Sequence, residues 1–344
     1  MKLLITTQAV DTEDPTLGFF VQWIQELAPH FESIEVVCLK EGLHTLPTNV
    51  TVHSLGKEKG KRSRMAYAAT YLALVWKLRN RYDASFAHMN QEYILIAGWL
   101  WKFMGKPIYM WRNHYAGSIL TDTAAVLCAK VFCTSTHSHT AKYRKTVLMP
   151  VGVDTSRFYP EDRIERTPRS LLFLARISPS KRPDVFIEAL GLLIAKGISF
   201  IGSVYGTPQP PDQAYYESLK GRAEALGLHD RIRFHGGVPN EKAADIYRAH
   251  ELFVNCSPSG MFDKTIFEAG ASGCIVLASS KDYADLTESR YHFTDAESLA
   301  DRLEYWLTSS QSERAATQEA SVALAQLQGL PDLGKRLAHE ILLA

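Results

Sequence analysis

Residues 257–273, SPSGMFDKTIFEAGASG, combine the residue types needed to bind an anion and a sugar. A short apolar run at 251–256 precedes a small-residue turn, and residues 263–271 have helix character. Backbone N–H groups and the helix dipole favour an anion at such a turn. Lys264 adds a positive charge, and Glu268 shares its helix face. The pattern predicts a phosphate at the turn and a hydroxyl-bearing sugar beside Glu268. A crossover helix with a surface Lys–Glu pair is the alternative.

The second half of the chain offers further candidate residues, some in the stretch 257–273 and some after two other apolar runs. Ser259 is expected to cap the helix of the first stretch, and Gly273 to end it. Arg176 and Lys181 follow the predicted strand SLLFLA, and two cations on one loop can neutralise a diphosphate. Gly206 ends the next predicted strand. A solvated loop is the alternative interpretation for Arg176 and Lys181.

The first half of the chain offers three candidates at predicted strand ends. His114 follows the strand that ends at Trp111 and could hydrogen-bond a sugar hydroxyl. His88 holds a parallel position, and a structural role is favoured for it. Gly18 ends a polar loop, where a glycine lets a backbone N–H approach a ligand closely; a plain turn glycine is the alternative.

The elements that must position these residues alternate between strands and helices along the whole chain. Short apolar runs separated by segments with helical spacing predict parallel sheets covered by helices on both faces. Ligands bind beyond the carboxyl ends of the strands in such sheets. The expected fold class is therefore α/β, with two Rossmann-like domains whose parallel sheets face a central cleft.

The length of 344 residues exceeds what one compact core usually holds. The charged, proline-flanked segment 160–169 is predicted to be an interdomain linker. Residues 1–160 are expected to form the first domain, on the acceptor side, and residues 161–330 the second, on the donor side. A final helix at about 331–344 is expected to pack back onto the first domain.

Composition and motifs exclude several function classes. The net charge of +1 gives no sign of a nucleic-acid partner, and five scattered cysteines favour a reducing compartment without a disulfide framework or zinc site. The chain contains neither GxGxxG after its first strand nor GxxxxGK[ST], so nicotinamide, flavin and P-loop chemistry are disfavoured. We expect a cytoplasmic protein, because no apolar run is long enough to span a bilayer.

Several of these segments together resemble the retaining sugar-nucleotide glycosyltransferases of the GT-B fold, family 4, also known as glycosyl transferases group 1. The resemblance rests on PVGVDTSRFYP (150–160), FLARISPSKRPDVFIEAL (173–190), residues 225–259 and FEAGASGCIVLAS (267–279). The first half matches more loosely, mainly in DPTLGFF and WRNHYAGS.

The resemblance implies transfer of a hexose-type sugar from a UDP- or GDP-sugar to an acceptor hydroxyl, with retention of configuration and without a metal or other cofactor. It assigns Arg176 and Lys181 to the donor diphosphate, Glu268 to the ribose hydroxyls and His114 to the transferred sugar. The expected catalytic residues are His114, Arg176 and Lys181. The remaining expected donor-binding residues are Gly18, Gly206, Ser259, Gly260, Met261, Phe262, Asp263 and Lys264.

One departure from the family pattern concerns the sugar. The family usually carries two glutamates eight residues apart, and here Gly260 stands at the first position. We expect backbone amides with Asp263 or Lys264 to take over its contacts, so the donor base, the sugar and the acceptor, whether a glycan, a lipid-linked or a small molecule, stay open. A non-catalytic nucleotide-sugar binder or partner subunit, and a nucleotide-sugar epimerase of the same shape, are the alternatives.

The basic loop at 57–64, KEKGKRSR, has a second possible use. Five positive residues stand there against Glu58, followed by a helix rich in aromatic residues. Each cation near an anionic lipid surface contributes on the order of 1 kcal/mol. The loop therefore predicts either peripheral contact with the inner face of a membrane or a solvated segment.

Overall fold

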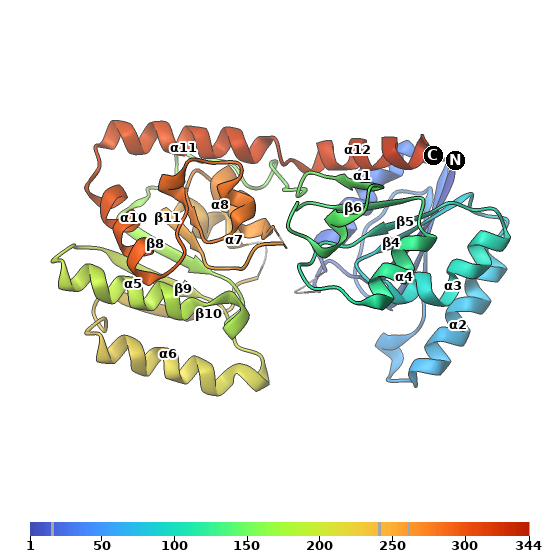
Figure 1. Ribbon diagram of the computed structural model, residues 1–344, viewed down its shortest axis with the longest axis horizontal. Coiled ribbons are helices and arrows are strands. Elements are labelled where there is room, and N and C mark those ends of the chain that lie inside the picture. The colour runs from blue at the N-terminus through green and yellow to red at the C-terminus, as the bar shows by residue number, and fades with distance from the viewer. Residues whose placement is uncertain (15–16, 240–241, 261, 344) are drawn as a thin grey trace. The chain divides into compact units, whose positions relative to one another are not determined.

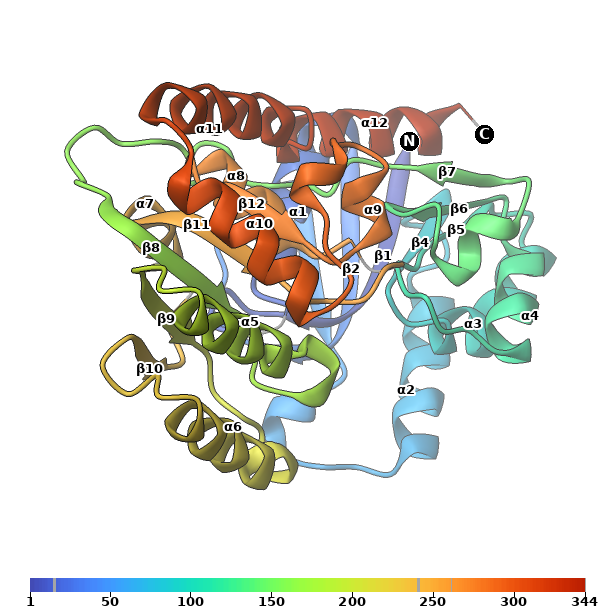
Figure 2. The same cartoon turned by 60° about the vertical axis from the view of Figure 1, so that its left-hand side comes forward.

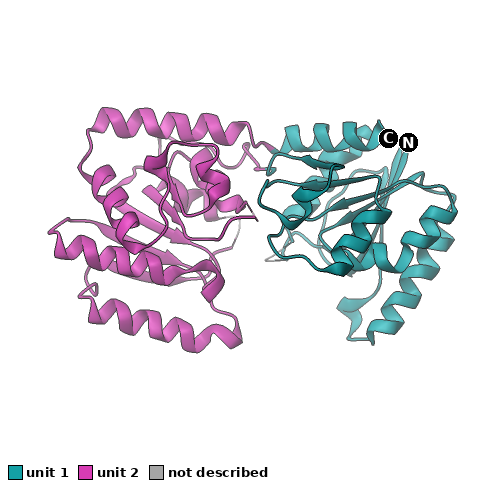
Figure 3. Ribbon diagram, in the orientation of Figure 1, with its two compact units in different colours: residues 1–152, 330–344 teal, residues 153–329 magenta. Residues whose placement is uncertain are grey.

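The computed structural model describes residues 1–14, 17–239, 242–260 and 262–343. The chain divides into two compact units (Figure 3). Unit 1 contains residues 1–152 and 330–344, and unit 2 contains residues 153–329. Both units are α/β structures with a wholly parallel sheet, as the sequence predicted.

Unit 1 is built on a seven-stranded sheet in the order β3-β2-β1-β4-β5-β6-β7. Figure 1 labels β4, β5 and β6 of this sheet. Its strands are β1 (Lys2–Val10), β2 (Ser33–Glu41), β3 (Val50–Ser54), β4 (Ala84–His88), β5 (Ile108–Trp111), β6 (Lys130–Cys133) and β7 (Thr146–Leu148). The order reverses between β1 and β4, so their carboxyl ends open a switch point.

Helices cover both faces of this sheet. They are α1 (Phe19–Leu27), α2 (Arg64–Lys77), α3 (Glu92–Phe103), α4 (Ile119–Leu127) and α12 (Leu330–Leu342). One buried cluster joins the sheet to α1 and α12, and a second joins its other face to α2, α3 and α4. The two clusters explain why the strands are apolar on both faces.

The last helix, α12, belongs to unit 1 although it follows unit 2 in the chain. It packs along α1 and buries Leu333 and Leu337 in the core. The Tyr109 hydroxyl donates to the Ile341 carbonyl at 3.0 Å, and Lys130 forms an ion pair with Glu340 at 2.9 Å. Residues 330–344 thus complete a core that the first 152 residues leave open.

Unit 2 is built on a five-stranded sheet in the order β10-β9-β8-β11-β12 (Figure 2). Its strands are β8 (Thr167–Leu174), β9 (Ile201–Tyr205), β10 (Ile232–Gly236), β11 (His250–Asn255) and β12 (Ile275–Ala278). Its helices are α5 (Pro183–Ala195), α6 (Gln213–Ala225), α7 (Ala243–Arg248), α8 (Lys264–Ala271), α9 (Lys281–Ala284), α10 (Ala296–Thr308) and α11 (Gln311–Gln326). The order reverses between β8 and β11, which are neighbours.

The segment predicted as a linker, 160–169, lies within unit 2. Arg248 donates to the carbonyls of Arg157 and Tyr159, and Arg166 donates to the carbonyls of His250 and Ser272, at 2.6–2.9 Å. These hydrogen bonds hold the segment against unit 2, so the division falls at residue 153. The charged residues and prolines of the segment did not indicate these hydrogen bonds.

Candidate functional site

The predicted residues of unit 2 all follow the carboxyl ends of its strands. Arg176 and Lys181 follow β8, Gly206 follows β9, and the stretch from Ser257 follows β11. Because β8 and β11 are paired neighbours on either side of the reversal in strand order, their loops meet at the switch point. Sequence positions about 80 residues apart are thereby brought into contact.

Lys181 contacts the start of α8 directly. Its Nζ lies 2.5 Å from Asp263 Oδ2 and 3.1 Å from Ser257 Oγ. Ser257 Oγ in turn donates to Asp263 Oδ2 at 2.8 Å. The three side chains form a closed set in which an ammonium group is fixed at the N-terminal end of a helix. The same end favours an anion through the helix dipole.

Asp263, and not Ser259, is the N-cap of α8. Its Oδ1 accepts from the backbone N–H of Thr265 at 3.3 Å and from the Thr265 hydroxyl at 3.0 Å. The expectation that Ser259 caps the helix is wrong, because the chain turns again before Lys264 and Ser259 Oγ accepts from the N–H of Lys281. Gly273 ends the helix with φ +84°, as predicted.

Burial alone would raise the pKa of Asp263. The charge of Lys181 and hydrogen bonds from Lys181, Ser257 and Asn255 outweigh it and hold this pKa well below its usual range. Asp263 is therefore a carboxylate at neutral pH, paired with a charged Lys181.

Lys264 and Glu268 occupy one face of α8 and are half-buried. Burial raises the pKa of Glu268, and Lys264 opposes that rise. Burial also lowers the pKa of Lys264, while Glu268 opposes that fall. Both side chains are only partly exposed, unlike those of a fully solvated surface pair. A half-buried carboxylate here can accept hydrogen bonds from hydroxyl groups.

The turn before α8 is held by a residue that the sequence analysis missed. The backbone N–H of Gly260 donates to Asp282 Oδ2 at 2.6 Å, and Ser280 Oγ donates to the same oxygen at 2.9 Å. Asp282 is buried on the short helix α9, which periodicity could not reveal because it has only four residues. Its carboxylate holds the turn that carries the predicted donor-binding residues.

Glycine at 260 also suits the backbone, because Gly260 has φ +90°. Phe262, at φ +38°, stacks on Phe267 with ring centroids 4.9 Å apart. Phe262 is buried and anchors the turn to the core. Met261, also expected to bind the donor, lies outside the described residues.

Arg176 differs from Lys181 in its surroundings. Its side chain is exposed and forms no ion pair or hydrogen bond with any residue that the structure describes. Gly206 supports the same edge, because a Cβ there would lie 1.9 Å from the Ala175 carbonyl oxygen. The chain after β8 therefore passes against the end of β9, and the guanidinium of Arg176 is available to an anion.

The candidate residues of unit 1, Gly18 and His114, are each held by local contacts. Gly18 begins α1, and its N–H donates to the Asp14 carbonyl at 2.9 Å. A Cβ at Gly18 would lie 2.7 Å from the Thr12 carbonyl oxygen, so the turn itself requires glycine. The half-buried His114 accepts from the N–H of Ala116 at 2.8 Å through Nδ1 and stacks on Tyr115.

His88 is structural, as favoured from the sequence. It is buried and stacks on Phe20 with ring centroids 3.7 Å apart, and its Nδ1 lies 3.2 Å from the Thr7 hydroxyl oxygen. Burial lowers the pKa of His88 to about 3, so the ring is neutral.

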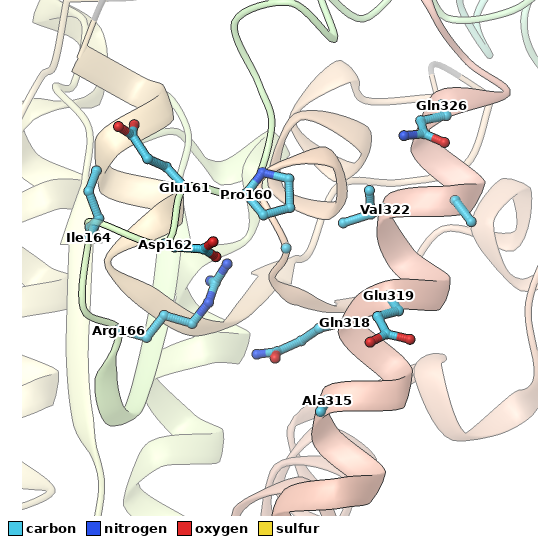
Figure 4. A pocket seen from close by; sticks show the side chains of 12 residues that line it. Pro160, Glu161, Asp162, Ile164, Arg166, Ala315, Gln318, Glu319, Val322 and Gln326 are labelled. Carbon is cyan, nitrogen blue, oxygen red and sulfur yellow. The ribbon is translucent and has the colours of Figure 1, made fainter.

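A cavity of about 470 Å³ lies elsewhere in unit 2, between residues 160–166 and α11 (Figure 4). Gly273, at the C-terminal end of α8, lines it, so the cavity and the Lys181–Asp263 pair lie at opposite ends of that helix.

Within the described residues there is no group of three or more histidine, cysteine or acidic side chains that could hold a metal ion. No helix in the described part of the chain is both long and apolar enough to cross a membrane.

Solved structures share this architecture. HepE of Anabaena, in complex with UDP and glucose, matches over the full length of both chains with a TM-score of 0.78 and 18% sequence identity. A glycosyltransferase of Rickettsia africae matches over 99% of both chains with a TM-score of 0.75 and 14% identity. At these identities the similarity establishes the fold alone. The predicted GT-B class, with two parallel-sheet α/β units, is confirmed.

The sequence of unit 2 is similar to that of a known family. Residues 156–322 match the family model of the glycosyl transferases group 1. D-inositol 3-phosphate glycosyltransferase of Geodermatophilus obscurus is 33% identical over 149 residues, covering 40% of this chain and 33% of that protein. Its counterpart in Streptomyces griseus is 36% identical over 113 residues, covering 32% and 24%. The chain thus spans about a third or less of the length of these relatives, and the resemblance to the group 1 family is confirmed in this unit.

Proposed function

We propose that the protein transfers a hexose-type sugar from a UDP- or GDP-sugar to an acceptor hydroxyl with retention of configuration and without a metal. The observation that carries this proposal is the grouping of Arg176, Lys181 and the N-terminal end of α8 at the switch point of unit 2. HepE was solved with UDP and with UDP-glucose, which supports a nucleotide sugar as the donor.

The chemistry requires stabilisation of a leaving diphosphate. The bond between the anomeric carbon and the diphosphate oxygen breaks, and the acceptor oxygen bonds to that carbon. The acceptor proton passes to the leaving phosphate oxygen, so the diphosphate itself acts as the base. Fixed positive groups around it stabilise the charge that develops in the transition state.

Each proposed role matches the local surroundings of the residue. Arg176 is exposed, has no hydrogen-bond or ion-pair partner among the described residues and offers a forked contact to phosphate oxygens. Lys181 supplies a charge whose position Asp263 fixes. Glu268, half-buried on α8, accepts hydrogen bonds from the ribose hydroxyls. His114 keeps the role that the resemblance assigns, a contact with the transferred sugar.

Two features support a second candidate, a nucleotide-sugar binder without transfer activity. Gly260 replaces a glutamate of the family pattern, and Asp263 offsets the charge of Lys181. In that case a nucleotide sugar would bind at the same edge without turnover.

One experiment tests the proposal and separates the two candidates. Purified protein is screened with UDP-glucose, UDP-N-acetylglucosamine and GDP-mannose, first by thermal shift and then by release of UDP or GDP with candidate acceptors. A ligand specific to the folded protein raises its stability by roughly 2.7 kcal/mol at a hundredfold excess over Kd. Binding with release supports transfer, and binding without release supports the second candidate. Binding by none of the donors contradicts both. The anomeric configuration of the product, read by NMR, tests retention.

A further inference from the structure

The outward faces of α2, α3 and α4 are apolar where a surface helix normally carries polar residues. On α2 the exposed stripe reads Met65, Ala69, Ala73 and Trp76, at spacings of four, four and three residues. The inward face of the same helix buries Tyr71 and Val75. The helix is therefore apolar on two opposite faces, and only one of them packs against the sheet.

The neighbouring helices continue this surface. Trp99 and Phe103 stand one turn apart on α3, and Ile119 and Val126 stand on the outer side of α4. Because α3 packs against both α2 and α4, the three stripes lie on one layer (Figures 1 and 2). Exposed apolar side chains gathered on one layer of helices indicate an interaction site.

Tryptophan placement shows that this surface is unusual within the chain. Four of the six tryptophans are at most 4% exposed. The other two, Trp76 at 47% and Trp99 at 60%, both belong to this layer, together with Met65 at 80% and Phe103 at 82%. Tryptophan is enriched where a protein meets the boundary between water and lipid.

Positive charge surrounds the apolar stripes. Lys77 and Arg79 stand at the C-terminal end of α2, with Arg79 stacked over the Trp76 ring at 4.3 Å, and Lys102 is exposed on α3. The basic loop precedes the N-terminal end of α2, and its cations Lys57, Lys59, Lys61, Arg62 and Arg64 are all exposed.

The nearby acidic groups do not cancel this charge. Glu58 accepts from the Ser54 hydroxyl and from the backbone N–H of Glu41, so its carboxylate is directed to the sheet edge. Asp122 on α4 is paired with Lys142 and contacts His139. Glu92 is the exposed carboxylate of α3. The layer is left with apolar stripes and an excess of cations.

We propose that the outer face of α2, α3 and α4, with the loop 57–64, docks onto an anionic lipid bilayer. Trp76, Trp99 and Phe103 enter the headgroup region, and the cations contact lipid phosphates. Aromatic and apolar groups supply contact area, and the cations supply preference for anionic lipid. This inference goes beyond the transfer reaction and stands independently of it.

The test uses the full-length protein and vesicles of phosphatidylcholine with or without phosphatidylglycerol. Co-sedimentation is expected with the anionic vesicles, with weaker binding at high salt. Brominated lipid should quench tryptophan fluorescence, because only Trp76 and Trp99 are exposed among the six. The absence of sedimentation with anionic vesicles at low salt overturns the proposal, and so does equal binding to pure phosphatidylcholine.

Matched variants locate the surface. The double variant Trp99→Ser/Phe103→Ser and the double variant Lys59→Glu/Lys61→Glu should each weaken vesicle binding at least about tenfold. Leu327→Ser and Lys242→Glu, at exposed positions of unit 2, are the controls and should bind as wild type. The thermal shift caused by a bound nucleotide sugar should be unchanged in all four variants. Loss of vesicle binding can therefore be distinguished from loss of donor binding.

Two outcomes of the variant series also overturn the proposal. One is vesicle binding that survives both double variants. The other is a wild-type dimer, measured by light scattering, that Trp99→Ser/Phe103→Ser converts to a monomer, since the face then serves a second copy of the chain.

Discussion

Lys181 Nζ lies 2.5 Å from Asp263 Oδ2, although 82 residues separate the two in the sequence. The pair joins the loop after β8 to the first turn of α8. Asp263 thus performs two tasks with different oxygens: Oδ1 caps the helix, and Oδ2 fixes the lysine. Most of both side chains is buried, so removal of one partner leaves a charge without compensation.

Replacement of Asp263 tests both tasks. Asp263→Ala should lower the free energy of unfolding by about 2–4 kcal/mol, because it removes the cap and leaves Lys181 unpaired. Asp263→Asn should cost less, because asparagine is also a good N-cap. Urea unfolding at neutral pH measures both. Equal losses in the two variants would show that the cap contributes nothing measurable.

The ion pair also predicts a dependence of stability on pH. The folded-state pKa of Asp263 is depressed, so its stabilising contribution is present above the unfolded value of about 3.9 and is lost as pH falls toward the folded value. Wild type should lose stability below about pH 4 more steeply than Asp263→Asn. Parallel curves for the two proteins between pH 5 and pH 2, as a rough range, would contradict the assigned pair.

Glu268 predicts how donor binding depends on pH. Burial raises its pKa above the ordinary value of about 4.3, so the carboxylate gains a proton at a higher pH than a solvated glutamate. A protonated carboxyl accepts fewer hydrogen bonds from ribose hydroxyls, and nucleotide affinity should fall as pH decreases through that raised pKa. Glu268→Gln should bind more weakly at neutral pH and lose this dependence. Calorimetric titration with UDP or GDP between neutral and acidic pH measures it, and an unchanged pH profile in the variant would remove Glu268 from the site.

Gly206 predicts a backbone requirement at the carboxyl edge of unit 2. A Cβ would lie 1.9 Å from the Ala175 carbonyl oxygen, so Gly206→Ala should destabilise the protein by roughly 2–4 kcal/mol. Gly221 is the matched control, since it lies in α6 with open space around its position. Gly221→Ala should raise stability by about 0.5–1 kcal/mol. Thermal unfolding measures the stability change of both variants. Similar stability changes in the two would contradict the close approach of the backbone at Gly206.

The helix α12 predicts that the end of the chain stabilises unit 1. Leu337 is buried against α1, so Leu337→Ala should cost about 2–4 kcal/mol. Leu343→Ala, at an exposed position near the chain end, should change stability by less than about 0.5 kcal/mol. Denaturant unfolding followed by tryptophan fluorescence measures both, because Trp23 of α1 belongs to the same buried cluster. A loss below 1 kcal/mol for Leu337→Ala, well short of the usual range of about 2–5, would argue against this packing.

The helices and strands could be predicted from the sequence, but the contacts between loops distant in the sequence could not. Periodicity predicted the buried runs SLLFLA and 251–256, which overlap β8 and β11, because apolar spacing records which residues face the core. The strand-end rule brought Arg176, Lys181 and Ser257 to one edge. The partner of Lys181 was not predicted, because a tertiary ion pair leaves no local pattern.

The errors have the same origin. Ser259 and Asp263 are both good N-caps by type, and only the turn at Gly260 determines which of them caps α8. Asp282, which holds that turn, stands on a helix of four residues that shows no periodicity. The charged segment 160–169 resembled a linker because the hydrogen bonds of Arg166 go to the carbonyls of His250 and Ser272, which are distant in the sequence.

The most direct test of the proposed function is donor turnover by Arg176→Ala. Arg176 is exposed and unpartnered among the described residues, so its loss should leave folding unchanged and remove only a contact to the leaving diphosphate. The control is Arg163→Ala, at another exposed position of unit 2. With the donor found by the screen, release of the nucleoside diphosphate by Arg176→Ala should fall at least about a hundredfold, with Arg163→Ala at the wild-type rate. Near-normal release by a folded Arg176→Ala would contradict the placement of the donor at this edge of unit 2.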